Sequence, residues 1–302
     1  MSPLVSLCMI VKNEGERLAD CLRTVSGAVR EIVIVDTGSS DDTVAVATAF
    51  GACISTFDFR QPDFSAARNR SLELATGDWI LVLDADERLT SSAAAMLPAL
   101  CGAGGGVGGA ENVGYVVQRR NLRAGTAEIL TDHAVRLFRN RPEHRYRGRV
   151  HETIDAAILA SGGQIRTSRL AIEHHLPPDD GRSLEKSRFY LEILEQELAL
   201  EPDNVERLGF LRAELHKLGL LDEATRTAER IAELAPDDAA HHVNVGLYRL
   251  VHRRDPGGAE RSFRRALALA PGDTRVLDFL RELRDRRFDD GVMALTHPRG
   301  EP

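Results

Sequence analysis

Long hydrophobic runs, a surplus of positive charge and paired cysteines are all missing from this sequence. No apolar run approaches the roughly 20 residues that a membrane-spanning helix needs, and residues 1–11 lack the basic opening of a signal peptide. We therefore expect a cytoplasmic protein without a membrane span. A net charge of −7 and a pI near 5.8 give no support to nucleic-acid binding. The cysteines show no paired spacing, so we expect them to be reduced and buried, without disulfides or a zinc site; they are Cys8, Cys21, Cys53 and Cys101.

Short apolar runs alternate with segments of helical spacing through the first 84 residues. The order β-α-β-α-β-α-β predicts a parallel sheet with right-handed crossovers. The apolar runs, which are typical of buried strands, lie at 5–11, 31–35, 52–57 and 79–83.

The last of these runs is followed at once by Asp84, Ala85 and Asp86. Carboxylates are costly in an apolar core, so we expect them to emerge at the carboxyl end of the strand, where open α/β sheets bind ligands. The strand period sends both side chains to one side, where they repel each other unless a cation or an arginine joins them. A divalent cation shared with a substrate diphosphate would do so. An acidic turn without a function is the plain alternative.

The second half of this α/β region shows weaker patterns. A glycine-rich stretch at 102–109 has no strand before it and no Gly-Lys-Ser/Thr after it, so we expect a surface loop and not a phosphate-binding loop. Strand-like segments follow at 114–119 and 134–138, and then a short basic stretch at 146–153. These patterns predict further strands but do not define their order in the sheet.

From residue 183 onward the chain alternates leucine with charged residues and has no strand pattern. Pro202, Pro236 and Pro271 close similar motifs 34 and 35 residues apart, a period that resembles tetratricopeptide repeats. We expect a catalytic domain over 1–180, helical repeats over 181–288 and a disordered tail over 289–302. Two whole repeats are too few for a stable solenoid, so we expect them to dock on the first domain.

Five motifs lie along the α/β region. They are Ile-Val-Lys-Asn-Glu at 10–14, Val-Asp-Thr-Gly-Ser-Ser-Asp-Asp-Thr at 35–43, Phe-Ser-Ala-Ala-Arg-Asn at 64–69, Gly-Asp-Trp through Asp-Ala-Asp-Glu at 77–87, and Arg-Leu-Phe-Arg-Asn at 136–140. By these motifs, residues 1–180 resemble a family 2 glycosyltransferase of the GT-A fold. The resemblance implies a mostly parallel sheet with flanking helices, followed here by the all-α repeats. The repeats further resemble a subgroup that includes the peptide S-glycosyltransferases of bacteriocin pathways.

The family implies a nucleotide-sugar donor, most commonly a UDP-sugar, with Mn²⁺ or Mg²⁺ and inversion at the anomeric carbon. Carried onto this sequence, Asp36 would hold the base or ribose, and Arg68 would line the nucleotide pocket. Asp84 would sit near ribose and cation, and Asp86 would bind the cation directly. Lys12 would be a surface charge or a neighbour of the phosphates. As alternatives without a function, Asp36 could be a turn residue and Arg68 a solvent-exposed residue of a helix.

An inverting transfer also needs a base on the face opposite the diphosphate. We assign Glu152 as this base and His151 as a third cation ligand, with the reverse assignment and Asp155 as alternatives; a surface Arg–Glu ion pair is the plain explanation. His174 and His175 could bind a metal, but neighbours in a strand point to opposite faces, so we do not expect both to coordinate.

Two other functions stay open. The chain could be a non-catalytic repeat adaptor with a degenerate sugar-nucleotide domain, or a sugar-1-phosphate nucleotidyltransferase. The latter would carry a Gly-rich basic loop after the first strand, where this chain has Lys-Asn-Glu-Gly at 12–15. For partners we expect a peptide or protein acceptor on the repeats, or a second protomer in a homodimer, and no nucleic acid.

Overall fold

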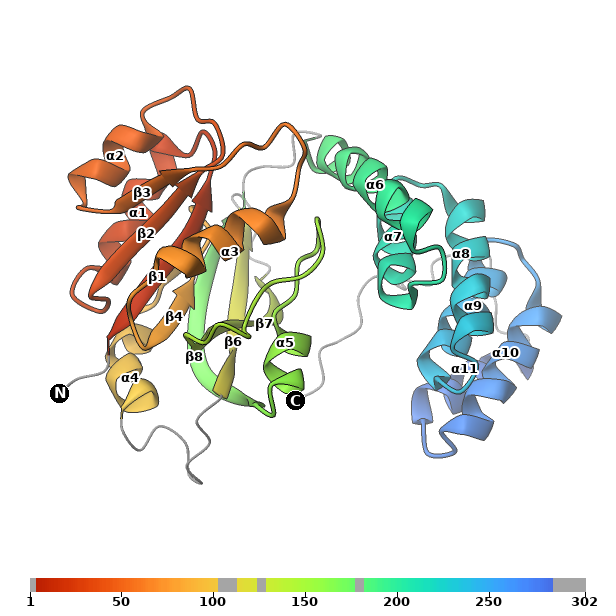
Figure 1. Ribbon diagram of the computed structural model, residues 1–302. Helices are drawn as coiled ribbons and strands as arrows, with labels where there is room; N and C mark the ends of the chain where they lie inside the picture. The colour runs from red at the N-terminus through yellow and green to blue at the C-terminus, as the bar shows by residue number, and fades with distance from the viewer. Residues whose placement is uncertain (1–3, 103–112, 124–128, 177–181, 285–302) are drawn as a thin grey trace. The chain divides into compact units, whose positions relative to one another are not determined.

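The computed structural model describes residues 4–102, 113–123, 129–176 and 182–284, and its contacts divide the chain into two compact units (Figure 1). Among these described residues, the strands belong to the N-terminal unit, and the C-terminal unit, here called the helical unit, consists of helices. The glycine-rich loop and the tail expected beyond residue 288 lie outside the described residues, apart from Gly102. This arrangement confirms the predicted α/β fold followed by an all-helical region.

The N-terminal unit is built on a mixed sheet of eight strands in the order β3-β2-β1-β4-β7-β6-β8-β5. The strands are β1 (Val5–Val11), β2 (Glu31–Asp36), β3 (Cys53–Thr56), β4 (Trp79–Val82), β5 (Glu87–Leu89), β6 (Val113–Arg123), β7 (Ile129–Arg139) and β8 (Gln164–Leu176). The helices are α1 (Gly15–Val25), α2 (Thr43–Ala49), α3 (Phe64–Leu74), α4 (Ser91–Cys101) and α5 (Asp155–Ala160).

The first four strands in the sheet order, β3 to β4, pair in parallel, as the alternation of strands and helices predicts. The other half differs, because β7 runs antiparallel to β4 and β6 antiparallel to β7. β8 returns parallel to β6, and β5 lies antiparallel to β8 at the edge. This second half carries side chains from distant parts of the chain toward the end of β4.

Alternating side chains of β1 face two separate hydrophobic clusters, one on each face of the sheet. Leu7 and Met9 belong to the cluster that includes α1 and α4. Cys8 belongs to the other cluster, with Leu72 of α3 and Ile158 of α5. The parallel strands are therefore buried on both faces, which explains their continuous apolar runs.

All four cysteines are free, and three of them are buried as expected. Cys53 is exposed, contrary to our prediction, because β3 is an edge strand of the sheet. Within the part of the chain that the structure describes, no helix is both long enough and apolar enough to cross a bilayer.

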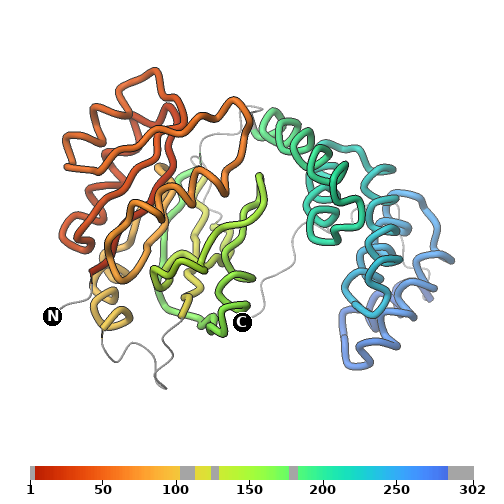
Figure 2. Tube along the Cα trace, viewed as in Figure 1, coloured from red at the N-terminus to blue at the C-terminus, as the bar shows by residue number. Residues whose placement is uncertain are grey.

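The helical unit stacks helices joined by short turns (Figure 2). Pro202, Pro236 and Pro271 each lie in the turn after a helix, so the period read from the sequence corresponds to a helix pair. Small residues permit close packing: a Cβ atom on Gly246 would meet the Phe263 ring at 2.5 Å. The helices are α6 (Arg182–Leu200), α7 (Val205–Lys217), α8 (Leu221–Leu234), α9 (Ala239–Val251), α10 (Pro256–Leu269) and α11 (Thr274–Arg284).

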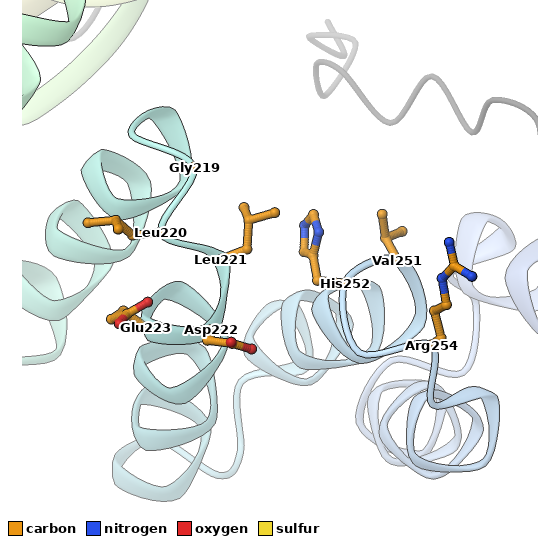
Figure 3. A pocket seen from close by; sticks show the side chains of 8 residues that line it. All are labelled: Gly219, Leu220, Leu221, Asp222, Glu223, Val251, His252 and Arg254. Carbon is orange, nitrogen blue, oxygen red and sulfur yellow. The ribbon is translucent and has the colours of Figure 1, made fainter.

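One pocket of the helical unit lies between the α7–α8 turn and the end of α9 (Figure 3). Leu220 and Val251, each 41% exposed, contribute apolar surface to it. Asp222, His252 and Arg254 add polar and charged groups to the same lining. The lining therefore combines exposed apolar side chains with charged ones.

Candidate active site

The loops that follow β1, β2 and β4 meet at one edge of the sheet, because these strands run parallel and their carboxyl ends lie together. The backbone N–H of Asn13, a residue with φ of 55°, donates to Ser39 Oγ at 2.9 Å and so joins the first two loops. Lys12, Asp36 and Asp84 follow or end these strands. The structure thus brings three of the predicted site residues to the same edge.

Asp36 is 5% exposed and closes the turn after β2. Its Oδ2 accepts hydrogen bonds from the backbone N–H groups of Gly38 and Ser39, each at 3.1 Å. Lys12 is exposed on the neighbouring loop. The turn-forming role of Asp36 is therefore present, and the nucleotide-binding roles of Asp36 and Lys12 stay predictions.

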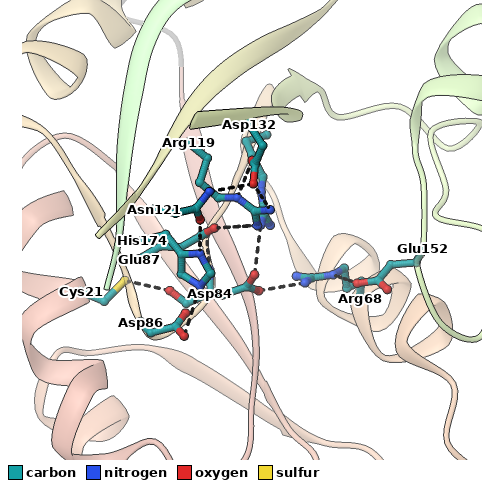
Figure 4. Close-up of polar contacts among 11 residues, drawn as sticks. Cys21, Arg68, Asp84, Asp86, Glu87, Arg119, Asn121, Asp132, Glu152 and His174 are labelled. Atoms are coloured by element: carbon teal, nitrogen blue, oxygen red, sulfur yellow. Dashed lines mark hydrogen bonds and ion pairs between the residues drawn. The ribbon is translucent and has the colours of Figure 1, made fainter. Parts of the chain in front are cut away.

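Asp84 lies within an alternating chain of carboxylates and guanidinium groups, part of which Figure 4 shows. Arg68 Nη2 donates to Asp84 Oδ1 at 2.8 Å, and Arg68 Nε donates to Glu152 Oε1 at 2.6 Å. From the other side, Arg136 Nη2 donates to Asp84 Oδ2 at 3.0 Å. Arginines therefore hold both carboxylate oxygens of Asp84, and Arg68 is an ion-pair partner instead of a solvated helix residue.

Glu87 extends this chain and is fully buried, with 0% exposure. Its Oε1 accepts from Arg136 Nη2 at 2.9 Å and from Arg119 Nη1 at 3.4 Å, while its Oε2 accepts from the backbone N–H of Asp84 at 2.9 Å. Arg119 in turn donates to both oxygens of Asp132, at 2.8 and 2.9 Å. Glu87 therefore positions both the backbone of Asp84 and the arginine that holds its side chain.

The pKa values of these groups follow from burial and ion pairing together. Burial raises the pKa of Asp84, but the guanidinium groups of Arg68 and Arg136 outweigh it and hold that pKa well below its ordinary value. For Glu87, burial dominates and raises the pKa, although Arg136 opposes the change. The pKa values of the two carboxyl groups are thus shifted in opposite directions, that of Asp84 downward by its guanidinium partners and that of Glu87 upward by burial.

Asp86 faces a different partner, His174 of β8 (Figure 4). The His174 Nε2 atom lies 3.4 Å from Asp86 Oδ2, and the two side chains are 17% and 20% exposed. Burial and the nearby carboxylates of Asp86 and Asp84 raise the pKa of Glu14 on the neighbouring loop. Negative charge therefore collects around Asp86, which favours a cation there.

The predicted metal ligands do not form a complete set by themselves. Among the described residues, no group of three or more His, Cys, Asp or Glu side chains could hold a metal ion, so Asp84, Asp86 and His151 make no three-ligand site. The metal-binding roles of these residues stay predictions. The histidine that lies beside Asp86 is His174. Because neighbours in a strand point to opposite faces, His174 can face Asp86 while His175 does not.

Glu152 lies in a loop and not in a strand. The only strand-like pairing within 146–153 is an isolated antiparallel bridge between Arg147 and Thr153. Its side chain is 13% exposed, so its pairing with Arg68 is not the surface ion pair of the plain explanation. Asp155, the alternative base, begins helix α5. The structure thus joins Glu152 to Asp84 through Arg68, and its role as a base stays a prediction.

Sequence reasoning missed several members of this site. Glu87 and Arg136 stand inside motifs that carry the family resemblance, and that position is a signal that could have identified them. Arg119, Asn121 and Asp132 belong to no such motif. They reach the site because β6 and β7 pair in antiparallel register, which places Arg119 opposite Asp132.

Residues 6–101 match the family model described as glycosyl transferase family 2. A TPR repeat-containing protein of Synechococcus elongatus is 44% identical over 156 residues, which cover 52% of this chain and 36% of that protein. The prophage-derived glycosyltransferase SunS of Bacillus subtilis is 27% identical over 231 residues, which cover 74% of this chain and 52% of SunS.

The chain thus spans about half or less of the length of these two curated relatives. Among solved structures, S. aureus TarS 1–349 aligns over 94% of this chain and 92% of its own, with a TM-score of 0.49 and 10% identity. The family match covers most of the parallel half of the sheet, including Lys12, Asp36, Arg68, Asp84 and Asp86. Residues 6–101, within the N-terminal unit, are thus similar to family 2 glycosyltransferases, and the helical unit follows them in the chain.

Proposed function

We propose that this protein transfers a sugar from a nucleotide-sugar donor, a UDP-sugar, to an acceptor, with inversion at the anomeric carbon. The observation that carries the proposal is the Asp86–His174 pair at the carboxyl edge of the sheet, beside the arginine-held Asp84. Ligands of open α/β sheets bind at this edge. The family match over residues 6–101 and the similarity to the glycosyltransferase SunS also support it.

A divalent cation fits the Asp86–His174 pair. Neighbouring ligands of an octahedral cation at about 2.1 Å lie about 3.0 Å apart, and the two side chains approach to 3.4 Å. A carboxylate suits Mg²⁺ and Mn²⁺, and the imidazole favours Mn²⁺ of the two. When bound, the cation would neutralise the charge that develops on the leaving diphosphate. In this proposal His174 takes the place of His151 as the partner of Asp86.

The surrounding residues then have distinct tasks. Arg68 and Arg136 keep Asp84 ionised and oriented toward the ribose and the cation. Glu152 accepts the proton of the acceptor nucleophile, and Arg68 orients Glu152 relative to the donor side of the site. Asp36 and Lys12 lie along the same edge, where the nucleotide would extend.

We further propose a peptide or protein acceptor bound by the helical unit. Stacked helical repeats form extended surfaces that bind polypeptide segments. The pocket with Leu220 and Val251 offers exposed apolar side chains next to charged ones, which suits such a segment. A homodimer formed through these helices is the second candidate, since the same apolar side chains could be covered by another copy.

Product analysis tests the reaction class. We expect the protein to release UDP slowly from one of a panel of UDP-sugars, and only when Mn²⁺ or Mg²⁺ is present. Release of pyrophosphate from sugar-1-phosphate and UTP would instead indicate nucleotidyl transfer. If no donor is consumed and no donor raises the thermal stability in the presence of Mn²⁺, the adaptor function is favoured.

Two variants test the acceptor site. Truncation after residue 178 should leave donor hydrolysis intact and abolish transfer to the acceptor. In the full chain, Leu220→Glu with Val251→Glu should raise the KM for the acceptor without changing donor hydrolysis. Unchanged transfer and an unchanged oligomeric state in both variants would remove the helical unit from acceptor binding and from dimerisation.

A further inference from the structure

His174 is held by a line of hydrogen bonds that runs away from Asp86. Its Nδ1 atom lies 2.7 Å from Asn121 Oδ1, across the paired strands β6 and β8. The other end of the same amide, Asn121 Nδ2, donates to Asp132 Oδ2 at 3.0 Å. Arg119 then donates to both oxygens of Asp132, at 2.8 and 2.9 Å.

Asp132 determines which way the Asn121 amide points. Burial raises the pKa of Asp132, but hydrogen bonds from Arg119 and Asn121 outweigh burial and lower that pKa overall. The carboxylate is therefore ionised and can only accept hydrogen bonds. An Asn121 amide turned the other way would put its oxygen 3.0 Å from a carboxylate oxygen, where no hydrogen could lie between them. The amide nitrogen therefore faces Asp132, and the amide oxygen faces His174.

This orientation in turn determines the tautomer of His174. The amide oxygen of Asn121 is an acceptor, so the hydrogen bond at 2.7 Å requires a proton on His174 Nδ1. A neutral imidazole carries only one ring proton, which leaves a lone pair on Nε2. Nε2 then lies 3.4 Å from Asp86 Oδ2 without a proton of its own, and a cation is what would join two such electron-rich atoms.

We propose that Asn121 and Asp132 are positioning residues that hold His174 in the Nδ1–H tautomer, with Nε2 presented beside Asp86 for a divalent cation. The cation role rests on the proposed function, whereas the tautomer does not. Arg119 completes the arrangement by keeping Asp132 in place with two hydrogen bonds. Partners of this kind, behind a metal ligand, commonly change metal affinity about 10- to 100-fold when they are removed.

The tautomer is measured directly by long-range ¹H–¹⁵N NMR on the full chain, after EDTA treatment and in alkaline buffer where the ring is neutral. His174 is assigned by comparison with His174→Gln. We expect the Nδ1–H tautomer in the unmodified protein. Asp132→Asn keeps the shape but lets the Asn121 amide turn, because the new side chain can give its oxygen to Arg119 and its nitrogen to Asn121. We expect this variant to shift His174 toward the Nε2–H tautomer.

Mn²⁺ binding, followed by EPR without any donor, supplies the second measurement. We expect Asn121→Leu and Asp132→Asn to weaken Mn²⁺ binding by about 10- to 100-fold. Arg120→Gln is the matched control, because Arg120 lies beside Asn121 on β6 but pairs with Glu173 at 3.8 Å and should leave both measurements unchanged. Circular dichroism checks that each variant is folded. If Asn121→Leu does not fold, the isosteric Asp132→Asn still tests the inference.

The outcomes separate this inference from the proposed function. An Nε2–H tautomer in the unmodified protein, or a tautomer and Mn²⁺ affinity that neither variant changes, would overturn the inference even if sugar transfer is demonstrated. The expected tautomers without Mn²⁺ binding by the unmodified protein would refute the cation role, and with it the metal-dependent function. Altered tautomers with weakened Mn²⁺ binding would support the inference whatever sugar the enzyme uses.

Discussion

Ion pairs along the helices of the helical unit differ from the ion pairs around Asp84 in the N-terminal unit. In the helical unit several ion pairs join exposed residues three or four positions apart on one helix, such as Glu260 with Arg264 and Asp278 with Arg281. In the N-terminal unit, Arg68 joins two carboxylates that lie 16 and 84 residues away in the sequence, and its side chain is 10% exposed.

This difference separates charges that support a helix from charges that form a site. Exposed pairs on a helix contribute about 0.3–0.5 kcal/mol each and mainly keep the surface solvated. Buried pairs gain little net stability, because desolvation offsets their attraction. A chain of largely buried arginines and carboxylates at the carboxyl edge of the parallel strands is therefore better explained by function than by stability.

The largest expected difference between the units is in activity. Asp86→Ala should reduce sugar transfer by about 10³-fold or more, because the charge on the leaving diphosphate loses its compensation. The variant should also lose the Mn²⁺-dependent stabilisation by donor in a thermal-shift assay while remaining folded. Asp203→Ala, which removes an exposed partner of Arg230 in the helical unit, is the control and should retain activity. Full wild-type activity in excess EDTA would contradict the cation role.

Removing the proposed base, Glu152, should reduce sugar transfer less than removing Asp86. Glu152→Gln keeps the shape of the side chain and removes its basicity, so transfer should fall by roughly 10²-fold or more. Donor affinity, measured by calorimetry, should stay within a few-fold of the wild type, because Glu152 is assigned to the acceptor side. A variant that transfers sugar at the wild-type rate would move the base elsewhere, with Asp155 as the next candidate.

Stability should separate buried from exposed arginines. Arg136→Met leaves Asp84 and Glu87 without a shared partner, and removing one side of a buried ion pair costs about 3–5 kcal/mol. Arg264→Met removes an exposed pair with Glu260 and should cost no more than about 0.5 kcal/mol. Urea unfolding followed by tryptophan fluorescence reports on the N-terminal unit, since Trp79 is the only tryptophan, and circular dichroism reports on the helices. Equal losses in both variants would remove the distinction drawn here.

The smallest expected effect concerns packing within the helical unit. Gly246→Ala places a methyl group 2.5 Å from the Phe263 ring, and such overpacking should cost about 1–3 kcal/mol. Gly209→Ala, in helix α7, meets nothing within 4 Å and should be neutral or slightly stabilising, because alanine favours helix more than glycine does. Circular dichroism melts of the two variants give the comparison. A neutral Gly246→Ala would mean that neighbouring helices yield more easily than their packing suggests.

Local pattern in the sequence was sufficient for the parallel half of the sheet and for the repeats. Strand and helix periods depend only on neighbouring residues, and the spacing of Pro202, Pro236 and Pro271 reflects one helix pair per repeat. The same reasoning located Asp84 and Asp86 after β4, because carboxylates cannot continue a buried run. Lys12 and Asp36 were identified through the family resemblance, and they follow or end strands at the same edge.

Only the tertiary structure decided which groups those carboxylates meet. The register of β6, β7 and β8 brings Asp132 and His174 to the site, and no local pattern encodes pairing between strands so far apart in the chain. Asp84 meets arginines and Asp86 an imidazole, because each partly buried charge must find a partner among the side chains that tertiary packing brings near. The sequence by itself therefore determined where the carboxylates stand, and long-range packing of strands and helices determined which side chains they meet.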